Sequence, residues 1–327
     1  VEALLLTCRN HAPLFQRYFR AKATILQLKP FTRYDLYAPG RTSLPRFSFD
    51  RAREIVLEAY RRLSPRAADL VARVYEERHL DAAVRRGKMG GAFCYSVLPH
   101  LTPYVLMNFT GQSRDVATLA HELGHALHGL LASKRSILTF HPSLPLAETA
   151  SVFGEQLLLE TWLSRERRTP IRQALLMTRL DDLYATILRQ AYFVEFERIA
   201  HQIAVEGATI DQLADRYLAL LREQFGKAVT LPESFRWEWL TIPHIFSTPF
   251  YCYAYSFGNL LALVLYERFR QEGRSFVPQY LDFLAAGGSQ SPEELLRPLG
   301  VDITSPKCWE QGFAQIHDTI AELERTI

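Results

Sequence analysis

Apolar residues recur three and four positions apart along most of the chain, which is the spacing of one buried face of an α-helix. The segment Arg51–Glu76 has this pattern on both sides of Pro65, and because proline interrupts a helix we expect two helices there. A longer run of the same pattern over Ile171–Val205 predicts one long buried helix that ends at Gly207. The pattern therefore favours a mainly α-helical protein.

Short capping motifs indicate where several of these helices begin. A serine or threonine followed three residues later by glutamate or glutamine satisfies the exposed amides of a helix's first turn. This motif occurs at Thr209–Gln212 and at Ser291–Glu294. A Ser-Pro start, which places proline at the first helical position, occurs at Ser305–Pro306. We expect a helix to start at each of these three positions.

Two stretches depart from the helical pattern. Within Gly90–Thr110, two β-prone runs, Ala92–Leu98 and Tyr104–Phe109, flank a proline-containing turn. We expect these runs to pair as strands that lead directly into the next helix. The second stretch, Arg33–Phe47, has no periodic pattern, so we interpret it as a linker or a surface lobe.

Composition narrows the class of protein. The chain has 327 residues, 48% of them hydrophobic, which is enough for one large domain or two smaller ones. The net charge is +3 and the charges are mixed, so a nucleic-acid partner is not favoured, and the longest apolar runs are too short to span a membrane. Four cysteines lie far apart without C-x-x-C spacing, and the first residues lack the basic leader of a secretory signal. We expect a cytoplasmic protein.

The strongest candidate chemistry lies in TLAHELGHALHG, Thr118–Gly129. On a helix, His121 and His125 are four residues apart and lie on one face, where both rings can reach one metal ion. His128 lies on nearly the same face, so its angle alone does not exclude it. Glu122 follows the first histidine, whereas an alanine follows the second, and only a carboxylate can take a proton from a metal-activated water. We therefore predict His121 and His125 as zinc ligands, Glu122 as general base, and His128 as a neighbour that packs or hydrogen bonds beneath the site.

A zinc site that hydrolyses its substrate needs three protein ligands and one open position, so a third ligand must come from elsewhere. Beyond two prolines, a helix that starts near Leu146 would carry Glu148 and Glu155 on one face. We predict Glu148 as the third ligand and Glu155 as the carboxylate that orients a ligand histidine through its other ring nitrogen. Gly124 costs the histidine helix about 1 kcal/mol relative to alanine, which suggests close packing there. The alternative is that these side chains make ordinary hydrogen bonds and bind no metal.

A late tyrosine-rich segment, HIFSTPFYCYAYSFG, offers neutral hydrogen-bond donors. Tyr251, Tyr253 and Tyr255 would share one side of an extended segment, but they would spread around a helix. Hydroxyl and imidazole groups, here including His244, are the donors that stabilise a developing oxyanion during peptide hydrolysis. The alternative is an aromatic core cluster.

The run GGAFCYS precedes the histidine helix and contains Gly91 and Ala92. A strand at the edge of a sheet can pair with the backbone of an extended peptide, and such pairing reads shape without reading sequence. We therefore predict Gly91 and Ala92 as substrate-binding residues. An ordinary core strand is about as plausible.

Together these residues resemble the oligoendopeptidase F branch of the thimet oligopeptidase family of zinc metallopeptidases. The resemblance rests on HELGHALH, AETASVFGE and IPHIFSTPFYCYAYSFG, and it extends to LKPFTRYDLYAP, GKMGGAFCYS and NFTGQSRDVATLAHELGHALHG. It implies a mainly α, zincin-like catalytic domain with a small β-sheet beside the active-site helix. It also implies one Zn²⁺ per chain, held by His121, His125 and Glu148, with Glu122 as general base and short peptides as substrates.

The resemblance further implies that His244 and Tyr253 donate hydrogen bonds to the developing oxyanion. Members of the wider family often have a tyrosine three residues before the latter, whereas this chain has Phe250. That donor's role is therefore lost or passes to Tyr251. Tyr251 and Tyr255 are the expected substrate contacts in this segment.

Members of the resembled family are nearly twice as long, with an N-terminal helical half that forms the other wall of a deep channel. We expect one catalytic domain over residues 1–327, with a helical lead-in over 1–80 and the zinc-site core over 81–327. Without that half, the chain is either a fragment or a compact form with a more open cleft. The predicted function is a zinc-dependent endopeptidase for short peptides. A zinc carboxypeptidase and a catalytically impaired peptide-binding protein are the alternatives, although an intact Glu122 argues against the second.

Overall fold

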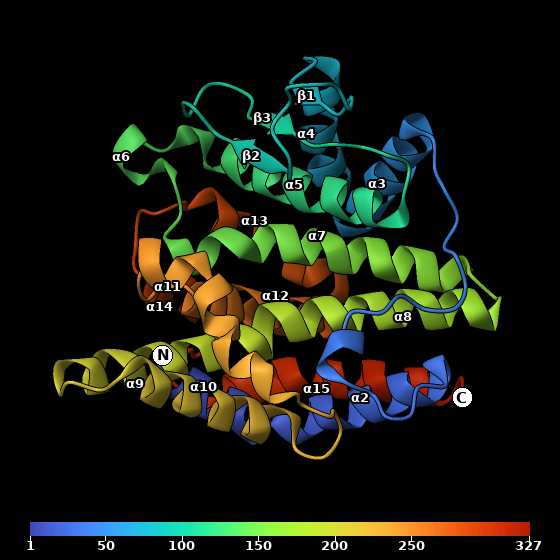
Figure 1. Ribbon diagram of the computed structural model, residues 1–327. Coiled ribbons are helices and arrows are strands. Elements are labelled where there is room, and N and C mark those ends of the chain that lie inside the picture. Colours follow the sequence, from blue (N-terminus) through green and yellow to red (C-terminus); the bar gives the residue numbers. More distant parts are fainter. The chain divides into compact units, whose positions relative to one another are not determined.

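Figure 1 shows the chain as a computed structural model that describes residues 1–327. The α-helices of nine residues or more are α1 (Glu2–Asn10), α2 (Ala12–Leu26), α3 (Phe49–Leu63), α4 (Pro65–Glu76), α5 (Ser113–Leu131), α7 (Leu144–Arg165), α8 (Thr169–Leu183), α9 (Arg189–Val205), α10 (Ile210–Phe225), α12 (Tyr253–Glu272), α13 (Phe276–Ala285) and α15 (Pro306–Glu324). Shorter α-helices are α6 (Ile137–Phe140), α11 (Pro243–Ser247) and α14 (Pro292–Leu296). The predicted mainly helical class is confirmed. None of the helices combines the length and the apolar character needed to cross a membrane.

The helix boundaries follow the local signals in the sequence. α3 ends at Leu63 and α4 begins at Pro65, and the Ser64 side chain between them accepts a hydrogen bond from the amide of Ala67. The capping boxes at Thr209–Gln212 and Ser291–Glu294 are both present, and both predictions are confirmed. The predicted helix over 171–205 is not uniform, because a π-helical segment, Tyr184–Leu188, separates α8 from α9. Within this segment the carbonyl of Ile187 accepts a hydrogen bond from the Ser256 hydroxyl, 2.8 Å away.

A small sheet precedes the histidine helix. Its strands are β1 (Leu80–Asp81), β2 (Phe93–Tyr95) and β3 (Tyr104–Leu106), in the order β1-β3-β2. The predicted pair is confirmed as an antiparallel β2–β3 ladder with Cys94 opposite Val105, although both strands are shorter than expected. β1 pairs in parallel with β3 and was not predicted, because two residues are too few to show a pattern. β2 is therefore an edge strand.

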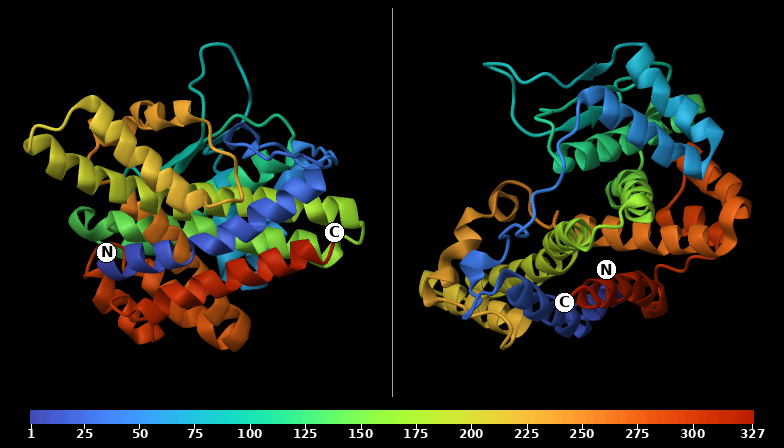
Figure 2. Two further views of the ribbon diagram at one scale, coloured as in Figure 1. Left: turned by 60° about the horizontal axis from the view of Figure 1, so that its bottom comes forward. Right: turned by 90° about the vertical axis from the view of Figure 1, so that its right-hand side faces the viewer.

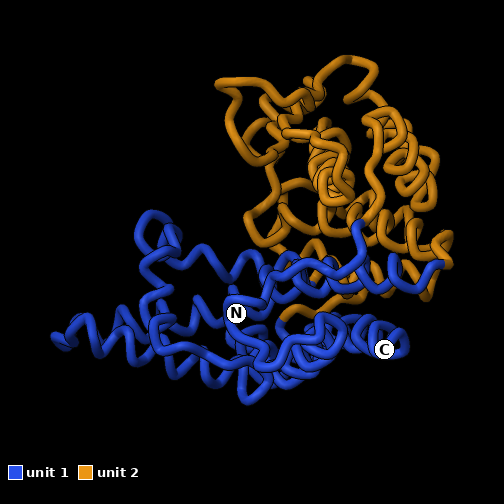
Figure 3. The backbone as a smooth tube through the Cα atoms, turned by 45° about the vertical axis from the view of Figure 1, so that its right-hand side comes forward, with its two compact units in different colours: residues 1–43, 168–260, 304–327 blue, residues 44–167, 261–303 orange.

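The chain divides into two compact units, coloured separately in Figure 3. Unit 1 comprises Val1–Ser43, Arg168–Leu260 and Thr304–Ile327, and unit 2 comprises Leu44–Arg167 and Leu261–Ile303. The first division, between Ser43 and Leu44, falls inside the stretch that we interpreted as a linker or lobe. The expectation of one catalytic domain with a lead-in up to residue 80 stays a prediction.

Each unit has its own apolar core. In unit 1, the rings of Phe15, Phe19, Tyr184 and Phe225 lie with centroids 5.0–6.0 Å apart. In unit 2, α5 packs along α7, and the two helices lie side by side in Figures 1 and 2. α3, α4 and α13 also pack against α5, which buries its apolar face. The helix that carries the histidines is thus the central helix of unit 2.

Candidate metal centre and cleft

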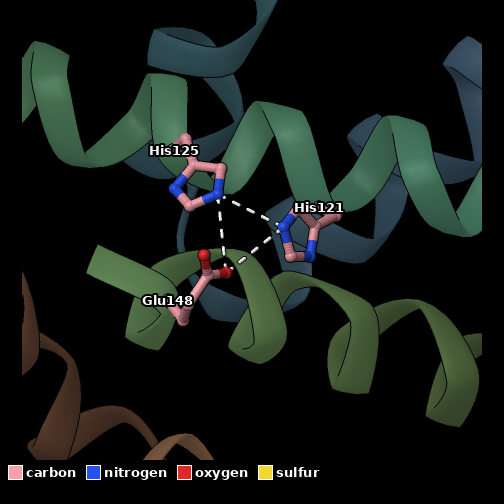
Figure 4. A group of neighbouring side chains, drawn as sticks. All are labelled: His121, His125 and Glu148. Carbon is pink, nitrogen blue, oxygen red and sulfur yellow. Dashed lines mark hydrogen bonds and ion pairs between the residues drawn. The ribbon is translucent and has the colours of Figure 1, made fainter. Parts of the chain in front are cut away.

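His121 and His125 project from α5 and Glu148 projects from α7, and the three side chains converge in Figure 4. The Nε2 atoms of the two histidines are 3.2 Å apart. Oε2 of Glu148 lies 3.3 Å from Nε2 of His121 and 3.6 Å from Nε2 of His125. The structure thus brings together the three side chains that the sequence analysis assigned as metal ligands. Their role as ligands stays a prediction.

The donor set fits a zinc ion. Zinc binds histidine nitrogen and carboxylate oxygen at about 2.0–2.2 Å in tetrahedral geometry, which puts neighbouring donors roughly 3.3 Å apart. The three separations here, 3.2, 3.3 and 3.6 Å, are close to that value. Each of the three side chains is about a quarter exposed, at 23–25%, so an ion can reach them. Three protein donors are the number found in catalytic rather than structural zinc sites.

A second carboxylate holds the first histidine. Oε1 of Glu155 lies 2.6 Å from Nδ1 of His121, so that Nε2 of the same ring is directed at Glu148. Glu155 lies where it was predicted, because Glu148 and Glu155 project from the same face of α7. Ser151, fully buried on the same helix, donates from its hydroxyl toward Oε2 of Glu148 at 2.9 Å. A carboxylate on Nδ1 and a hydroxyl on the carboxylate are the outer contacts that orient metal ligands.

Two glycines let α5 and α7 approach closely enough for this arrangement. A Cβ at Gly124 would lie within 3.0 Å of backbone atoms of Ala150 and Ser151, closer than real Cβ atoms come. A Cβ at Gly154 would clash with the Tyr60 hydroxyl, which itself donates to the Ala120 carbonyl at 2.7 Å. The helix-interior glycine at 124 therefore has the close-packing reason that the sequence suggested. Gly154 carried the same signal and was not singled out.

The charges of the cluster favour a cation. Burial lowers the pKa of His121, but its hydrogen bonds with Glu148 and Glu155 outweigh this and raise that pKa well above its ordinary value. Burial raises the pKa of Glu148, but the hydrogen bond and charge of the histidines bring it down to about 2. Burial, with the charge of His121, lowers the pKa of His125 to about 4. Two carboxylates therefore stabilise positive charge at a site whose second imidazole is a neutral donor.

Glu122 is buried beside this cluster, with 5% of its surface exposed. Burial is the main cause that raises its pKa, to about 7, and the carboxylates of Glu148 and Glu155 raise it further. The charge of His121 and a hydrogen bond from the Cys94 backbone lower this pKa in part. Its Oε2 atom is buried and has no hydrogen-bond partner in the protein. An acid with a pKa near neutrality and one oxygen unengaged is suited to accepting and returning a proton.

His128 lies one turn beyond the second histidine and is 4% exposed. It does not belong to the group of possible metal ligands, which consists of His121, His125 and Glu148. Burial lowers its pKa to about 3, with a further contribution from His125, so its imidazole is neutral. Its Nδ1 atom has no hydrogen-bond partner in the protein. His128 lines the cleft beside the cluster, and its role as a packing or hydrogen-bonding neighbour stays a prediction.

A cleft of about 460 Å³ opens over the cluster. Its lining includes the edge strand and its flanks, Ala92–Ser96, and the segment Phe140–Pro142. Ala92 thus lines the cleft, as expected of a substrate contact, whereas Gly91 is not among the lining residues. Gly91 adopts a positive φ of 79°, and its carbonyl accepts a hydrogen bond from the Asn108 side chain. The wall formed by Phe140–Pro142 had no signal in the sequence.

The predicted oxyanion donors lie in unit 1. Tyr253 is the first residue of α12 and Tyr255 lies in its first turn, so these two tyrosines are on a helix and not on an extended segment. Tyr251 lies before the helix. The ring of His244, on α11, stacks on Tyr251 with centroids 5.5 Å apart. Nε2 of His244 lies 3.3 Å from the Tyr255 hydroxyl. His244, Tyr251 and Tyr255 thus form one ring cluster, and all three side chains are partly exposed.

The turn before this cluster contains a strained residue. Phe250 has a φ of +61°, which non-glycine residues rarely adopt. Its amide donates to Oε1 of Glu197 at 2.8 Å, and the Glu197 side chain is 1% exposed. The position that lacks the family's usual tyrosine is therefore held by a buried carboxylate on α9.

Comparison with known proteins agrees with this fold. A sequence model described as Peptidase family M3 matches residues 2–315. Oligopeptidase PepF of Bacillus subtilis is 31% identical over 99% of this chain and 49% of its own length. An oligoendopeptidase F homolog of Borreliella burgdorferi is 32% identical over 92% of this chain and 52% of its own. The chain therefore spans about half the length of the curated relatives it matches.

Solved structures agree as well. A putative peptidase from Chlamydophila abortus has a TM-score of 0.89 and 30% identity, covering 99% of this chain and 55% of that one. Oligoendopeptidase-F from Enterococcus faecium has a TM-score of 0.75 and 25% identity, covering 99% of this chain and 52% of that one. The match runs from one end of the chain to the other, includes the histidine helix, and confirms the resemblance stated from the motifs. The chain belongs to peptidase family M3.

Proposed function

We propose that this chain is a zinc-dependent endopeptidase that hydrolyses short peptides. The observation that carries the proposal is the convergence of His121, His125 and Glu148 with a buried Glu122 on the floor of one cleft. The names of its relatives, oligopeptidase and oligoendopeptidase, support the substrate class.

Zinc would provide one chemical function at this site, and the protein would orient its ligands. When bound by His121, His125 and Glu148, zinc supplies a Lewis acid that polarises a water and a peptide carbonyl. Glu155 keeps the His121 ring oriented through its 2.6 Å contact, and Ser151 does the same for Glu148. These two contacts restrict the rotamers of the ligands, so that little ordering is left to occur on metal binding.

Glu122 is the proposed group that transfers a proton from the attacking water to the leaving amine. Its unengaged Oε2 is placed to accept a proton from the attacking water and to return that proton to the leaving amine. The hydrogen bond from the Cys94 backbone holds the carboxylate toward β2. One carboxylate therefore serves both halves of the reaction.

The peptide backbone would lie along the open edge of β2. β3 occupies only one side of this strand, and the strand lines the cleft beside the cluster. Backbone pairing at a sheet edge binds peptides largely without regard to their side chains. Ala92 is the proposed contact there, and Gly91 sets the turn that leads into the strand. For His244 and Tyr253 the role of oxyanion donors, and for Tyr251 and Tyr255 that of substrate contacts, rests on the family resemblance.

The test is Glu122→Gln against Glu54→Gln, a matched change at an exposed position on α3. We expect Glu122→Gln to bind zinc stoichiometrically and to lose about a thousandfold or more in kcat, because the general base is absent. The control should retain both properties. Zinc content is measured by elemental analysis, and turnover with a quenched-fluorescence peptide blocked at both ends. Full activity in Glu122→Gln would refute the assignment. Cleavage confined to peptides with an unblocked C-terminus would instead identify a carboxypeptidase.

A further inference from the structure

A segment that lines the cleft joins the two helices that carry the metal cluster. It runs from the end of α5 to the start of α7, and its residues Phe140, His141 and Pro142 line the cleft together with β2. We call Thr139–Pro142 the rim. The Phe140 ring is 1% exposed and meets the His141 ring edge-on, with centroids 4.8 Å apart. The Phe140 ring is therefore packed inside the protein, and His141 and Pro142 are the rim side chains that a bound peptide can meet.

The rim has few anchors of its own. α6 has only four residues, and its first two, Ile137 and Leu138, are 51% and 91% exposed. What holds the rim lies about 150 residues away, in the turn after α13. The amide of Gly288 donates to the Thr139 carbonyl at 2.9 Å. The Arg135 side chain, just before the rim, donates to the Ala285 carbonyl, also at 2.9 Å.

The contact between this turn and the rim is backbone against backbone. A Cβ at Gly287 would lie 2.6 Å from the Phe140 carbonyl oxygen and 2.7 Å from that of Thr139. A Cβ at Gly288 would come even closer to the carbonyl oxygen of His141. Gly287 also has a φ of +55°, which disfavours any side chain, whereas Gly288 has no such restriction. At Gly288 the objection to a side chain is therefore one of space alone.

A carbonyl cannot turn aside as the end of a flexible side chain can. Any side chain at Gly288 must push the rim's backbone away from the turn, or else displace the turn. Because consecutive residues move together, the side chains of Phe140–Pro142 would shift within the cleft. Glu148 is the fifth residue of α7, whose contacts with α5 at Gly124 and Gly154 are independent of the rim.

We propose that Gly287 and Gly288 are positioning residues for substrate: they fix the rim, and the rim selects peptides with an apolar or aromatic side chain beside the scissile bond. The inference rests on the proposed peptidase function and adds the determinant of its preference. It separates two properties of one cleft, since metal binding depends on α5 and α7 while this preference depends on the turn after α13. The selected class follows from the His141 and Pro142 rings, which are accessible in the cleft, while the buried Phe140 ring supports His141 through their edge-on contact.

Three variants test the proposal. Gly288→Ala adds the clashing carbon. Arg135→Met removes the second tether without adding bulk at the contact. Gly40→Ala is the matched control, because its φ is unstrained and its Cβ would make only ordinary contacts of 3.5 Å or more. Peptides with phenylalanine or with glutamate beside the cleaved bond are compared in kcat and KM, and zinc affinity is titrated in each apoprotein.

We expect Gly288→Ala to raise KM for the phenylalanine peptide by about tenfold, which corresponds to about 1.4 kcal/mol of binding. Arg135→Met should raise KM about threefold, the control should change nothing, and zinc affinity should be equal in all proteins. The glutamate peptide should lose less, so that discrimination between the peptides narrows. Unchanged KM values in a folded Gly288→Ala, or equal losses for both peptides, would overturn the inference. If Gly288→Ala does not fold, Arg135→Met decides by the same criteria.

A binding measurement separates this inference from the proposed function. Peptide affinity is measured by fluorescence anisotropy with each rim variant combined with Glu122→Gln, so that no turnover is needed. If the unmodified chain cleaves nothing yet the rim variants weaken binding of the phenylalanine peptide, the proposed function fails and the positioning role stands. If cleavage occurs and the rim variants bind both peptides as tightly as the parent, the positioning role fails alone.

Discussion

The metal cluster of unit 2 and the ring cluster of unit 1 are held in place by different means. His121, His125 and Glu148 stand on helices of 19 and 22 residues that pack along each other. His244, by contrast, lies on a five-residue helix, and Tyr255 lies in the first turn of α12 after an irregular segment. The positions in the first cluster follow from close packing between long elements. Those in the second depend on single contacts, which makes the two clusters sensitive to different substitutions.

The largest expected difference between the clusters concerns metal affinity. His125→Ala removes one of three donors, and because structural zinc binding is worth about 10–16 kcal/mol over its full ligand set, roughly a thousandfold or more should be lost. His244→Ala should leave zinc affinity unchanged. Competition with a chromophoric chelator measures both. Stoichiometric tight zinc in His125→Ala would remove the distinction between the two clusters, and so would loss of zinc in His244→Ala.

Substitutions of residues that contact the two clusters from outside should also affect zinc affinity only at the metal cluster, but by a smaller factor. Glu155→Gln weakens the 2.6 Å contact to Nδ1 of His121, and losing such a contact typically costs 10–100-fold in metal affinity, so we expect about tenfold or more. Tyr255→Phe removes the 3.3 Å contact to His244 and should leave metal affinity unaltered. The same chelator titration compares them. Equal zinc affinities in Glu155→Gln and the unmodified chain would show that packing alone orients the His121 ring.

The same contrast explains what the sequence could predict. The positions of His121 and His125 follow from four-residue spacing on one helix, and the shared face of Glu148 and Glu155 follows from seven-residue spacing on another. These are local relations, and the mainly helical class follows from the same periodicity. Gly124 even indicated close packing against the histidine helix, although not the element that packs there.

The unpredicted features are those that join distant segments. The hydroxyl of Tyr60 reaches the Ala120 carbonyl across 60 residues, and Gly288 meets the rim across nearly 150. No spacing rule connects such positions. The two-residue β1 and the π-helical segment are local, but each is a departure too short to alter a periodic pattern. The strained φ of Phe250 likewise depends on Glu197, a partner 53 residues away.

Close packing of the metal cluster predicts a loss of stability rather than of affinity alone. Gly124→Ala would gain about 1 kcal/mol of helix propensity. It would also insert a carbon against the backbone of Ala150, and such overpacking costs about 1–3 kcal/mol or more. We expect net destabilisation by about 1–2 kcal/mol in urea unfolding, with Gly40→Ala near zero. A Gly124→Ala protein more stable than the parent would show that α5 and α7 have room to separate.

The smallest effect on stability is expected at Phe250, beside the ring cluster. There a glycine should again be more stable than an alanine, but for a different reason from that at position 124, where space is the limit. Replacing Phe250 by alanine or by glycine removes the ring in both cases, so the difference between the two variants reports the backbone alone. A left-handed φ costs an ordinary residue about 1–2 kcal/mol, while glycine loses about 0.5–1 kcal/mol more entropy on folding. We therefore expect Phe250→Gly to be more stable than Phe250→Ala by about 0.5–1 kcal/mol in urea unfolding. Glycine is required at 124 for lack of space, and it would be favoured at 250 for its conformation. If Phe250→Ala is instead the more stable variant, the turn is free to relax, and Glu197 does not hold the backbone in the strained form.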